Sequence, residues 1–305
     1  MRKLIILAIV GFAAQLIDGS LGMGYGVTSS TLLVLAGLTP AAASASVHFS
    51  ELGTNIAAGV SHWKLKNTDW RVVARIAGPG AVGAFLGATV LSNLSTEAAA
   101  PVMAVVLAAL GVYILIRFIA GIRPKVRRPL TLKFLAPLGV FAGFIDATGG
   151  GGWGPVATPA LLADGRLEPR KVVGSIDTSE FAVSAAASLG FLVGLGASGI
   201  NWGFAVALLV GGLFAAPLAA ALVRYAPMHV LGVAIGGVIL LTNSRVLLKT
   251  FEVSGATRWW IYGAIALVTL IGMYIAAIRK RQRAAAEAAA AADDETAEAS
   301  ASAAG

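Results

Sequence analysis

The chain of 305 residues contains no cysteine and few charged residues. The absence of cysteine excludes disulfide bonds, thiolate catalysis, cysteine-ligated zinc and iron–sulfur clusters. Asp, Glu, Lys and Arg together make up 12% of the residues, about half the usual share in a soluble domain. The GxxxxGK[ST] loop of nucleotide-driven proteins is absent, as are the HExxH and GxSxG motifs of common hydrolases. We therefore expect neither an enzyme nor an ATP-driven pump, and no bound cofactor.

Apolar residues are correspondingly abundant. They make up 57% of the chain, and the mean hydropathy is +0.83. Glycine, with 37 residues, is as frequent as expected for membrane helices that pack closely. We predict an all-α polytopic membrane protein that has the lipid bilayer as a partner. The net charge of +8 does not indicate a nucleic-acid partner, because the basic residues collect in short loops between apolar segments.

Eleven apolar segments divide the chain. They lie at 3–17, 27–38, 41–62, 71–92, 97–118, 132–146, 153–164, 170–196, 202–223, 228–248 and 258–278. Several approach the ~20 residues needed to cross a bilayer. The four segments that flank the glycine motifs described next are shorter. We expect these short segments to form half-helices or re-entrant hairpins that meet at an unwound tip.

The clearest motif occurs twice. An aspartate followed by a glycine ladder reads D-x3-G-x-G-[YW]-G at 18–26 and again at 146–154. Further matches follow in the same order, with P-x9-S-E at 40–51 and 169–180 and an Asx-Trp pair at 69–70 and 201–202. The offset between the copies drifts from 128 residues at the aspartates to 132 at the tryptophans. This ordered agreement indicates that the chain arose by duplication of a half.

The duplication predicts the domain organisation. Residues 3–120 form transmembrane repeat 1 and residues 132–250 form transmembrane repeat 2, joined by a basic cytoplasmic linker at 121–131. An additional transmembrane helix follows at 257–279. The alanine-rich residues 280–305 have no core to pack against, and we expect a disordered cytoplasmic tail there.

Clusters of Lys and Arg indicate the orientation. They lie at 64–75, 117–133, 166–171 and 279–283, and short basic loops face the cytoplasm. With these four inside, segment 41–62 runs inward and its counterpart 170–196 runs outward. The two repeats therefore have inverted topology, and the C-terminus is cytoplasmic, in a protein of the bacterial inner membrane. Arg2 and Lys3 favour the opposite side for the N-terminus, whose side stays open.

Inverted repeats with broken helices are a recurring design of secondary transporters, which bind substrate between the halves near the membrane midplane. Each half-helix after a tip would begin with free N–H groups and a positive dipole end, which suit an anion. If the tips form one site, they should approach each other. The candidate substrate-binding residues are Ser20, Gly22, Gly24, Gly26, Thr28, Ser29, Asn55, Thr148, Gly150, Gly152, Trp153, Gly154 and Thr158. The alternative is that the glycines form tight turns and the hydroxyls only pack helix against helix.

Asp18 and Asp146 precede the two tips. A carboxylate at bilayer depth costs about 2.5–3.5 kcal/mol, so each needs a partner or a proton. Either the two aspartates couple transport to an ion, or each accepts hydrogen bonds from the glycine amides of its own tip.

Ionisable pairs also recur on the long segments. His48 lies one turn before Glu51, and Asp177 lies one turn before Glu180, so each pair shares a helix face. This spacing suits a proton relay. It equally suits side chains that tie the tips to the long helices through Ser50 and Ser179.

The paired glycine motifs, the P-x9-S-E repeat and the basic loop between the halves resemble those of the sulfite exporter TauE/SafE family, also called the 4-toluene sulfonate uptake permease family. The resemblance covers residues 4–278. The positions that match the motifs are Asp18, Gly22, Gly24, Gly26, Ser50, Glu51, Asp146, Gly150, Gly152, Gly154, Ser179 and Glu180. Members are bacterial, archaeal and plant membrane proteins implicated in moving sulfite, sulfonates and related organosulfur anions, so the resemblance implies such a role here. The halves differ at His48 against Asp177 and at Val27 against Pro155, so the half-sites need not be equivalent.

The sequence therefore predicts a secondary transporter, by preference an exporter, of sulfite, a sulfonate or a related small organosulfur anion. It would work by alternating access between the repeats. A proton or sodium ion as coupling ion and a homo-oligomeric state stay open. The alternatives are an anion channel and a membrane-embedded metalloenzyme that uses His48, Glu51, Asp177 and Glu180, although we expect no metal.

Overall fold

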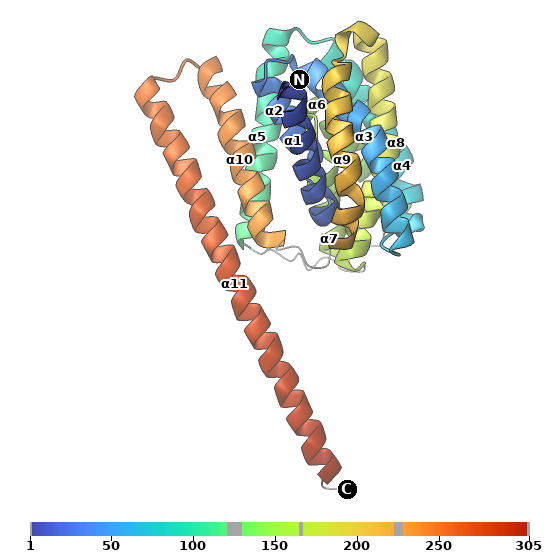
Figure 1. Cartoon of the computed structure of the whole chain (residues 1–305), viewed down its shortest axis with the longest axis vertical. Helices are drawn as coiled ribbons and strands as arrows, with labels where there is room; N and C mark the ends of the chain where they lie inside the picture. Colours follow the sequence, from blue (N-terminus) through green and yellow to red (C-terminus); the bar gives the residue numbers. More distant parts are fainter. Residues whose placement is uncertain (1, 121–129, 165–166, 223–227, 304–305) are drawn as a thin grey trace.

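The computed structural model describes residues 2–120, 130–164, 167–222 and 228–303, and these residues form helices joined by short turns (Figure 1). The α-helices are α1 (Arg2–Leu21), α2 (Tyr25–Leu35), α3 (Pro40–Lys64), α4 (Trp70–Ser92), α5 (Thr96–Ala120), α6 (Leu132–Gly149), α7 (Trp153–Asp164), α8 (Pro169–Leu195), α9 (Trp202–Leu222), α10 (Met228–Thr250) and α11 (Gly255–Ala303). A short 3-10 helix, η1 (Ala197–Gly199), follows α8. Within the described ranges, eight helices are long and apolar enough to cross a membrane. The predicted all-α polytopic class is confirmed.

The helices that lead into the tips are longer than expected. α1 has 20 residues and α6 has 18, and both are of membrane-spanning length. Both helices continue through the motif aspartates, because a helical backbone satisfies its own hydrogen bonds at membrane depth. Only α2, with 11 residues, and α7, with 12, are half-length. The prediction of short segments was therefore right for the second arm of each tip and wrong for the first.

α3 and α8 lie at the centre of the bundle. They pack against each other, and α3 also packs on α9 while α8 packs on α4. α1 then covers α9, α6 covers α4, and α5 pairs with α10. By their order in the repeats, α1 corresponds to α6, α3 to α8 and α4 to α9. The α1–α9 pair therefore has its equivalent in α6–α4, and the α3–α9 pair has its equivalent in α8–α4, as expected for a duplicated chain.

Close backbone contact holds these pairs together. A Cβ added to Gly11 of α1 would lie 2.3 Å from the carbonyl oxygen of Leu208 in α9. A Cβ added to Gly139 of α6 would lie 2.8 Å from the carbonyl oxygen of Ile76 in α4. The two contacts are equivalent, since Gly139 follows Gly11 by the 128-residue offset and Leu208 follows Ile76 by the 132-residue offset. Small residues allow this approach, which drives helix association within a membrane.

α11 stands apart from the bundle. It packs on α10 and α5, and its membrane-spanning part is largely exposed. The helix continues beyond the bundle to Ala303 (Figure 1), so the extra transmembrane helix expected at 257–279 is the first part of a longer one. Residues 280–303 of the expected tail thus have a helical backbone, which their many alanines favour. The expected linker at 121–131 falls largely outside the described residues.

Candidate functional site

The two glycine tips contact each other. A Cβ added to Gly26 would lie 2.5 Å from the Cα of Gly151. One added to Gly154 would lie 2.5 Å from the carbonyl oxygen of Gly22. No side chain fits in either place, so the backbones of the two repeats touch. The expectation that the tips approach each other is confirmed.

The chain turns at equivalent glycines. Gly22 has φ +68° and Gly150 has φ +73°, in the left-handed region that glycine enters without steric cost. Gly150 ends α6 as a left-handed cap. The repeat seen in sequence is therefore also a repeat of backbone conformation.

A hydroxyl from the opposite repeat closes each tip. Ser30 of α2 donates a hydrogen bond to the carbonyl oxygen of Gly150, and Thr158 of α7 donates one to the carbonyl oxygen of Gly22. Ser30 and Thr158 are equivalent positions 128 residues apart. Since unwound carbonyls need a partner inside a membrane protein, each repeat completes the backbone of the other.

The motif aspartates cap the half-helices. Asp146 Oδ1 accepts hydrogen bonds from the backbone N–H groups of Gly152 at 2.7 Å and Trp153 at 3.0 Å. Asp18 Oδ1 accepts one from the backbone N–H of Tyr25 at 3.2 Å. The capping alternative therefore describes one oxygen of each aspartate. The backbone N–H groups that were expected to bind a substrate anion thus donate to these two carboxylates instead.

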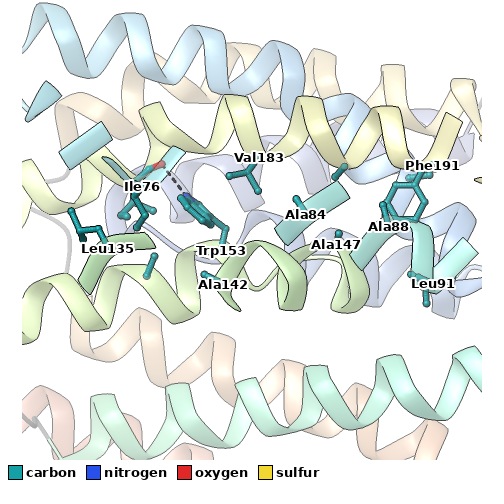
Figure 2. Packing of buried hydrophobic residues seen from close by; sticks show 14 of the residues in the cluster. Ile76, Ala84, Ala88, Leu91, Leu135, Ala142, Ala147, Trp153, Val183 and Phe191 are labelled. Atoms are coloured by element: carbon teal, nitrogen blue, oxygen red, sulfur yellow. Dashed lines mark hydrogen bonds between the residues drawn. The ribbon is translucent and has the colours of Figure 1, made fainter. Parts of the chain in front are cut away.

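Buried aromatic residues tie the tips to the central helices. The Tyr25 hydroxyl lies 2.9 Å from Ser50 Oγ of α3. The indole N–H of Trp153 donates to the carbonyl oxygen of Ile176 in α8 at 3.2 Å, drawn as the dashed line in Figure 2. In that view Trp153 lies among apolar side chains of the core, including Leu135 and Val183. Its N–H group has a protein partner and is not presented to a substrate.

The second oxygen of Asp146 faces the central helix of the other repeat. Asp146 Oδ2 lies 3.9 Å from His48 Nδ1, and the same nitrogen lies 2.8 Å from Glu51 Oε2. Ser184 of α8 donates to that glutamate oxygen at 3.1 Å. His48, Glu51 and Asp146 are buried, and we call these three residues the His48 half-site.

The equivalent residues of the other repeat form a cluster of carboxyl groups. One oxygen from each of Asp18, Asp177 and Glu180 lies within 4.8 Å of the others. All three residues are buried, and we call them the Asp177 half-site. Each half-site combines the tip acid of one repeat with the central helix of the other. The two differ because an acid, Asp177, stands where the first has His48.

A second histidine borders the Asp177 half-site. His62 Nε2 of α3 lies 3.2 Å from Asp177 Oδ2, although the pair lacks hydrogen-bond geometry. His62 Nδ1 lies 3.2 Å from the side-chain amide nitrogen of Asn67. An amide nitrogen only donates, so Nδ1 is the acceptor in this contact. His62 thus lies between Asn67 and the Asp177 half-site.

A polar contact joins the central helices between the half-sites. The amide of Asn55 in α3 donates to Ser184 Oγ in α8 at 3.3 Å. Asn55 was expected to bind substrate, and the structure places it in this contact. The resulting chain of contacts runs from Asn55 through Ser184 to Glu51 and His48.

Several expected residues make contacts other than the one between the tips, or none. Thr28 lines a cavity beside α10, and Thr148 faces α4, where its hydroxyl would lie 3.0 Å from a Cβ added to Gly87. Ser20 donates within its own helix to Leu16. Ser29 is buried, and its hydroxyl has no hydrogen-bond partner.

Four contributors were missed in the sequence. Ser30, Tyr25 and Ser184 occupy the repeat positions of Thr158, Trp153 and Asn55, so applying the repeat offset to those candidates identifies them. His62 has no counterpart in the second repeat, and no motif marked it.

The charges of the two half-sites do not balance. Asp18, Glu51, Asp146, Asp177 and Glu180 provide five buried carboxyl groups, beside the imidazoles of His48 and His62. In a low-dielectric interior these groups cannot all be ionised without compensating cations. The arrangement is therefore suited to taking up protons or a metal cation.

Comparisons with known proteins agree with this architecture. A family model described as sulfite exporter TauE/SafE matches residues 7–246, which include both tips and both half-sites. The probable membrane transporter protein YtnM of Bacillus subtilis (strain 168) is 50% identical over 273 residues, covering 88% of this chain and 91% of that protein. No solved structure gave a significant match. The protein is a membrane transporter and not an enzyme, so the metalloenzyme alternative is excluded. Because the family model covers most of its length, the chain belongs to the sulfite exporter TauE/SafE family.

Proposed function

We propose that the protein is a secondary transporter of sulfite, a sulfonate or a related small organosulfur anion, working by alternating access between inverted repeats. The observation that carries this proposal is the reciprocal closure of the tips by Ser30 and Thr158. If one repeat moves against the other, both hydrogen bonds break together. The tips then part and become accessible from one side of the membrane.

Parting of the tips would create an anion site. The hydroxyls of Ser30 and Thr158 donate to carbonyl oxygens in the closed structure, and the same O–H groups can donate to the oxygens of a sulfite or sulfonate group. The dipoles of α2 and α7 point their positive ends at the same place. No Lys or Arg takes part in this site, which suits weak and reversible binding.

The direction of transport follows from charge. The inside-negative membrane potential drives an anion outward, by about 2.3 kcal/mol per charge and 100 mV. The basic loops support a cytoplasmic C-terminus in a bacterial inner membrane. The matching helix pairs, α1–α9 with α6–α4 and α3–α9 with α8–α4, support the presence of two repeats. Export is therefore the favoured direction.

The Asp177 half-site is the better place for a coupling cation. Its three carboxyl groups are buried together and His62 lies beside Asp177, whereas the other half-site has two carboxyl groups, Glu51 and Asp146, with His48 between them. A proton or a sodium ion would supply the missing positive charge. Asp18 would carry this signal to the first tip, because its Oδ1 caps α2.

Flux measurements in proteoliposomes test the transporter role. We expect Glu51→Gln and Glu180→Gln to lower transport by about tenfold or more while the purified protein stays monodisperse with a near-normal unfolding midpoint. Glu168→Gln is the matched control, because Glu168 is exposed and pairs with Arg170 at the surface. Normal flux in both half-site variants would eliminate the coupling role.

The substrate class and the channel alternative need separate measurements. A binding screen of sulfite, sulfoacetate, taurine, sulfate and thiosulfate should identify at least one organosulfur ligand, and no binding of any of them would contradict the substrate proposal. A channel would conduct with a turnover far above that of a carrier and without dependence on a proton or sodium gradient.

A further inference from the structure

One face of α10 borders a series of cavities outside the tips. A cavity of about 220 Å³ lies between α1, α2 and α10, with a lining that includes Ile17, Leu32 and Val238. One turn farther along α2 and α10, a cavity of about 140 Å³ has Leu35 and Leu241 in its lining. A third cavity, of about 630 Å³, follows at the junction of α10 and α11. The second and third cavities share Arg245 and Tyr262, while the first shares no lining residue with them and lies one turn away along the same two helices. We refer to this row of three cavities along α10 as a groove.

The groove changes character along its length. The end near α1 is lined by aliphatic side chains and two threonines. The end near α11 is lined by Arg245, Lys249 and Arg258 together with aromatic side chains, and no carboxylate belongs to this lining. A basic residue in the last turn stabilises a helix dipole, which accounts for Lys249. Arg258 of α11 also has a structural contact, because its Nε–H donates to the carbonyl oxygen of Val253 at 2.8 Å, which leaves the other guanidinium N–H groups to bind an anion.

The dimensions match one leaflet of a membrane. Ala234 borders the apolar end and Lys249 the basic end, and the 15 residues between them span ~22 Å along a helix. Half a bilayer with its headgroups is about 20–22 Å thick. Trp259 and Trp260, which are 76% and 81% exposed, flank the basic end, and tryptophan marks the membrane–water interface. The three cations therefore lie at headgroup depth, and the aliphatic end lies at the depth of the acyl chains.

We infer that this groove, which we call the α10 groove, binds one anionic phospholipid. Its phosphate contacts Arg245, Lys249 and Arg258, and one acyl chain follows α10 towards Ile17. Charge selects an anionic over a zwitterionic headgroup, because three cations meet no carboxylate in the lining. A free oxyanion shares the headgroup chemistry but would leave the aliphatic end unused.

The lipid site is separate from the proposed site of the transported anion, but it borders the first glycine tip. Ile17 precedes Asp18, and its Cγ2 would lie 3.4 Å from a Cβ added to Gly24 at the first tip. Asn243 of α10 also donates to Thr31 Oγ1 of α2 at 3.1 Å, which holds the groove wall against the half-helix. The acyl chain thus ends behind the first tip.

Native mass spectrometry of the full chain tests the inference. The protein is reconstituted into bilayers of equimolar phosphatidylglycerol and phosphatidylcholine and then released gently. Wild type should retain one phosphatidylglycerol per chain. Arg245→Gln and Arg258→Gln should each lower its affinity by about fivefold. The control Lys3→Gln/Arg71→Gln removes two exposed charges elsewhere and should retain the lipid.

A second variant distinguishes a lipid from a free anion. Ala234→Leu fills the aliphatic end and should displace the phospholipid, whereas Ala266→Leu on the exposed face of α11 should not. Retention by Ala234→Leu, together with displacement of the bound species by millimolar sulfate, would mean a free-anion site and overturn the inference. Equal retention of both lipids by wild type, or unchanged retention by the arginine variants, would also overturn it.

Discussion

At the residue scale, the two oxygens of Asp146 have different tasks. Oδ1 of Asp146 caps α7, while Oδ2 has no hydrogen-bond partner and faces His48. Asp18 similarly caps α2 and contributes an oxygen to the Asp177 half-site. The alternatives of structural cap and coupling group, which the sequence left open, are therefore compatible in one side chain.

Substitutions at Asp146 separate these tasks. In Asp146→Asn the amide oxygen can still accept both backbone hydrogen bonds, so we expect near-normal stability with loss of coupled transport. In Asp146→Ala two buried N–H groups lose their acceptor, at about 1–3 kcal/mol each, and the unfolding midpoint in detergent should fall clearly. Equal midpoints for the two variants would contradict the capping role, and full coupled flux in Asp146→Asn would contradict the charge role.

Asp177 tests the difference between the half-sites. Asp177→Asn removes one of three clustered carboxyl groups, so uphill transport driven by a proton or sodium gradient should fall by about tenfold while downhill exchange persists. Asp69→Asn is the control, because Asp69 caps α4 and asparagine caps equally well. A gradient response equal to that of wild type would show that the coupling cation binds elsewhere.

Motifs revealed the acids and glycines but not their partners. Asp18, Glu51, Asp146 and Glu180 were identified because they recur with fixed spacing. The contact of Thr158 with Gly22 depends on how the two repeats cross, and it joins residues 136 positions apart. Sequence periodicity carries no such information, so Thr158, whose hydroxyl was assigned to substrate, was found closing the opposite tip.

At the scale of elements, the apolar segments of the sequence match the α-helices of the described residues but not η1, and they underestimate the length of α1 and α6. α1 and α6 keep helical hydrogen bonding through polar residues such as Asp18 and Ser20, because the alternative is an unsatisfied backbone in a membrane. Residues 280–303 are helical because alanine favours a helix even without packing. In both cases backbone energetics outweighed side-chain polarity.

The contact between tips depends on a bare backbone. Gly26→Ala places a Cβ 2.5 Å from the Cα of Gly151, where no flexible side chain can move away. We expect a cost of about 1–3 kcal/mol, a lower unfolding midpoint and impaired transport. Gly78→Ala on α4 is the matched control, since nothing lies within 4 Å of its added Cβ. Wild-type stability and flux in Gly26→Ala would mean that the tips do not need this contact.

At the scale of the whole molecule, alternating access requires that the repeats move relative to each other. Thr68 precedes α4 in the first repeat and Thr178 lies in α8 of the second, with their hydroxyls 3.4 Å apart. This separation is compatible with a disulfide after replacement, and the chain has no other cysteine. We expect oxidised Thr68→Cys/Thr178→Cys to lose transport and a reductant to restore it.

The control for this cross-link lies within four residues at the start of α11. Ser254 and Thr257 have hydroxyls 2.8 Å apart near the start of α11, so Ser254→Cys/Thr257→Cys constrains no movement between repeats and should transport normally when oxidised. Full transport by the cross-linked Thr68/Thr178 variant would rule out relative movement of the repeats at this contact.

The exchange of hydroxyls between tips also has a consequence for biogenesis. Thr158, which completes the first tip, is synthesised 136 residues after Gly22, the residue whose carbonyl it satisfies. The first repeat therefore enters the membrane with an unfinished turn and must wait for the second to be inserted. A chain truncated after the first repeat would keep this defect and be a target for membrane quality-control proteases, whereas supplying the second repeat as a separate polypeptide would repair it.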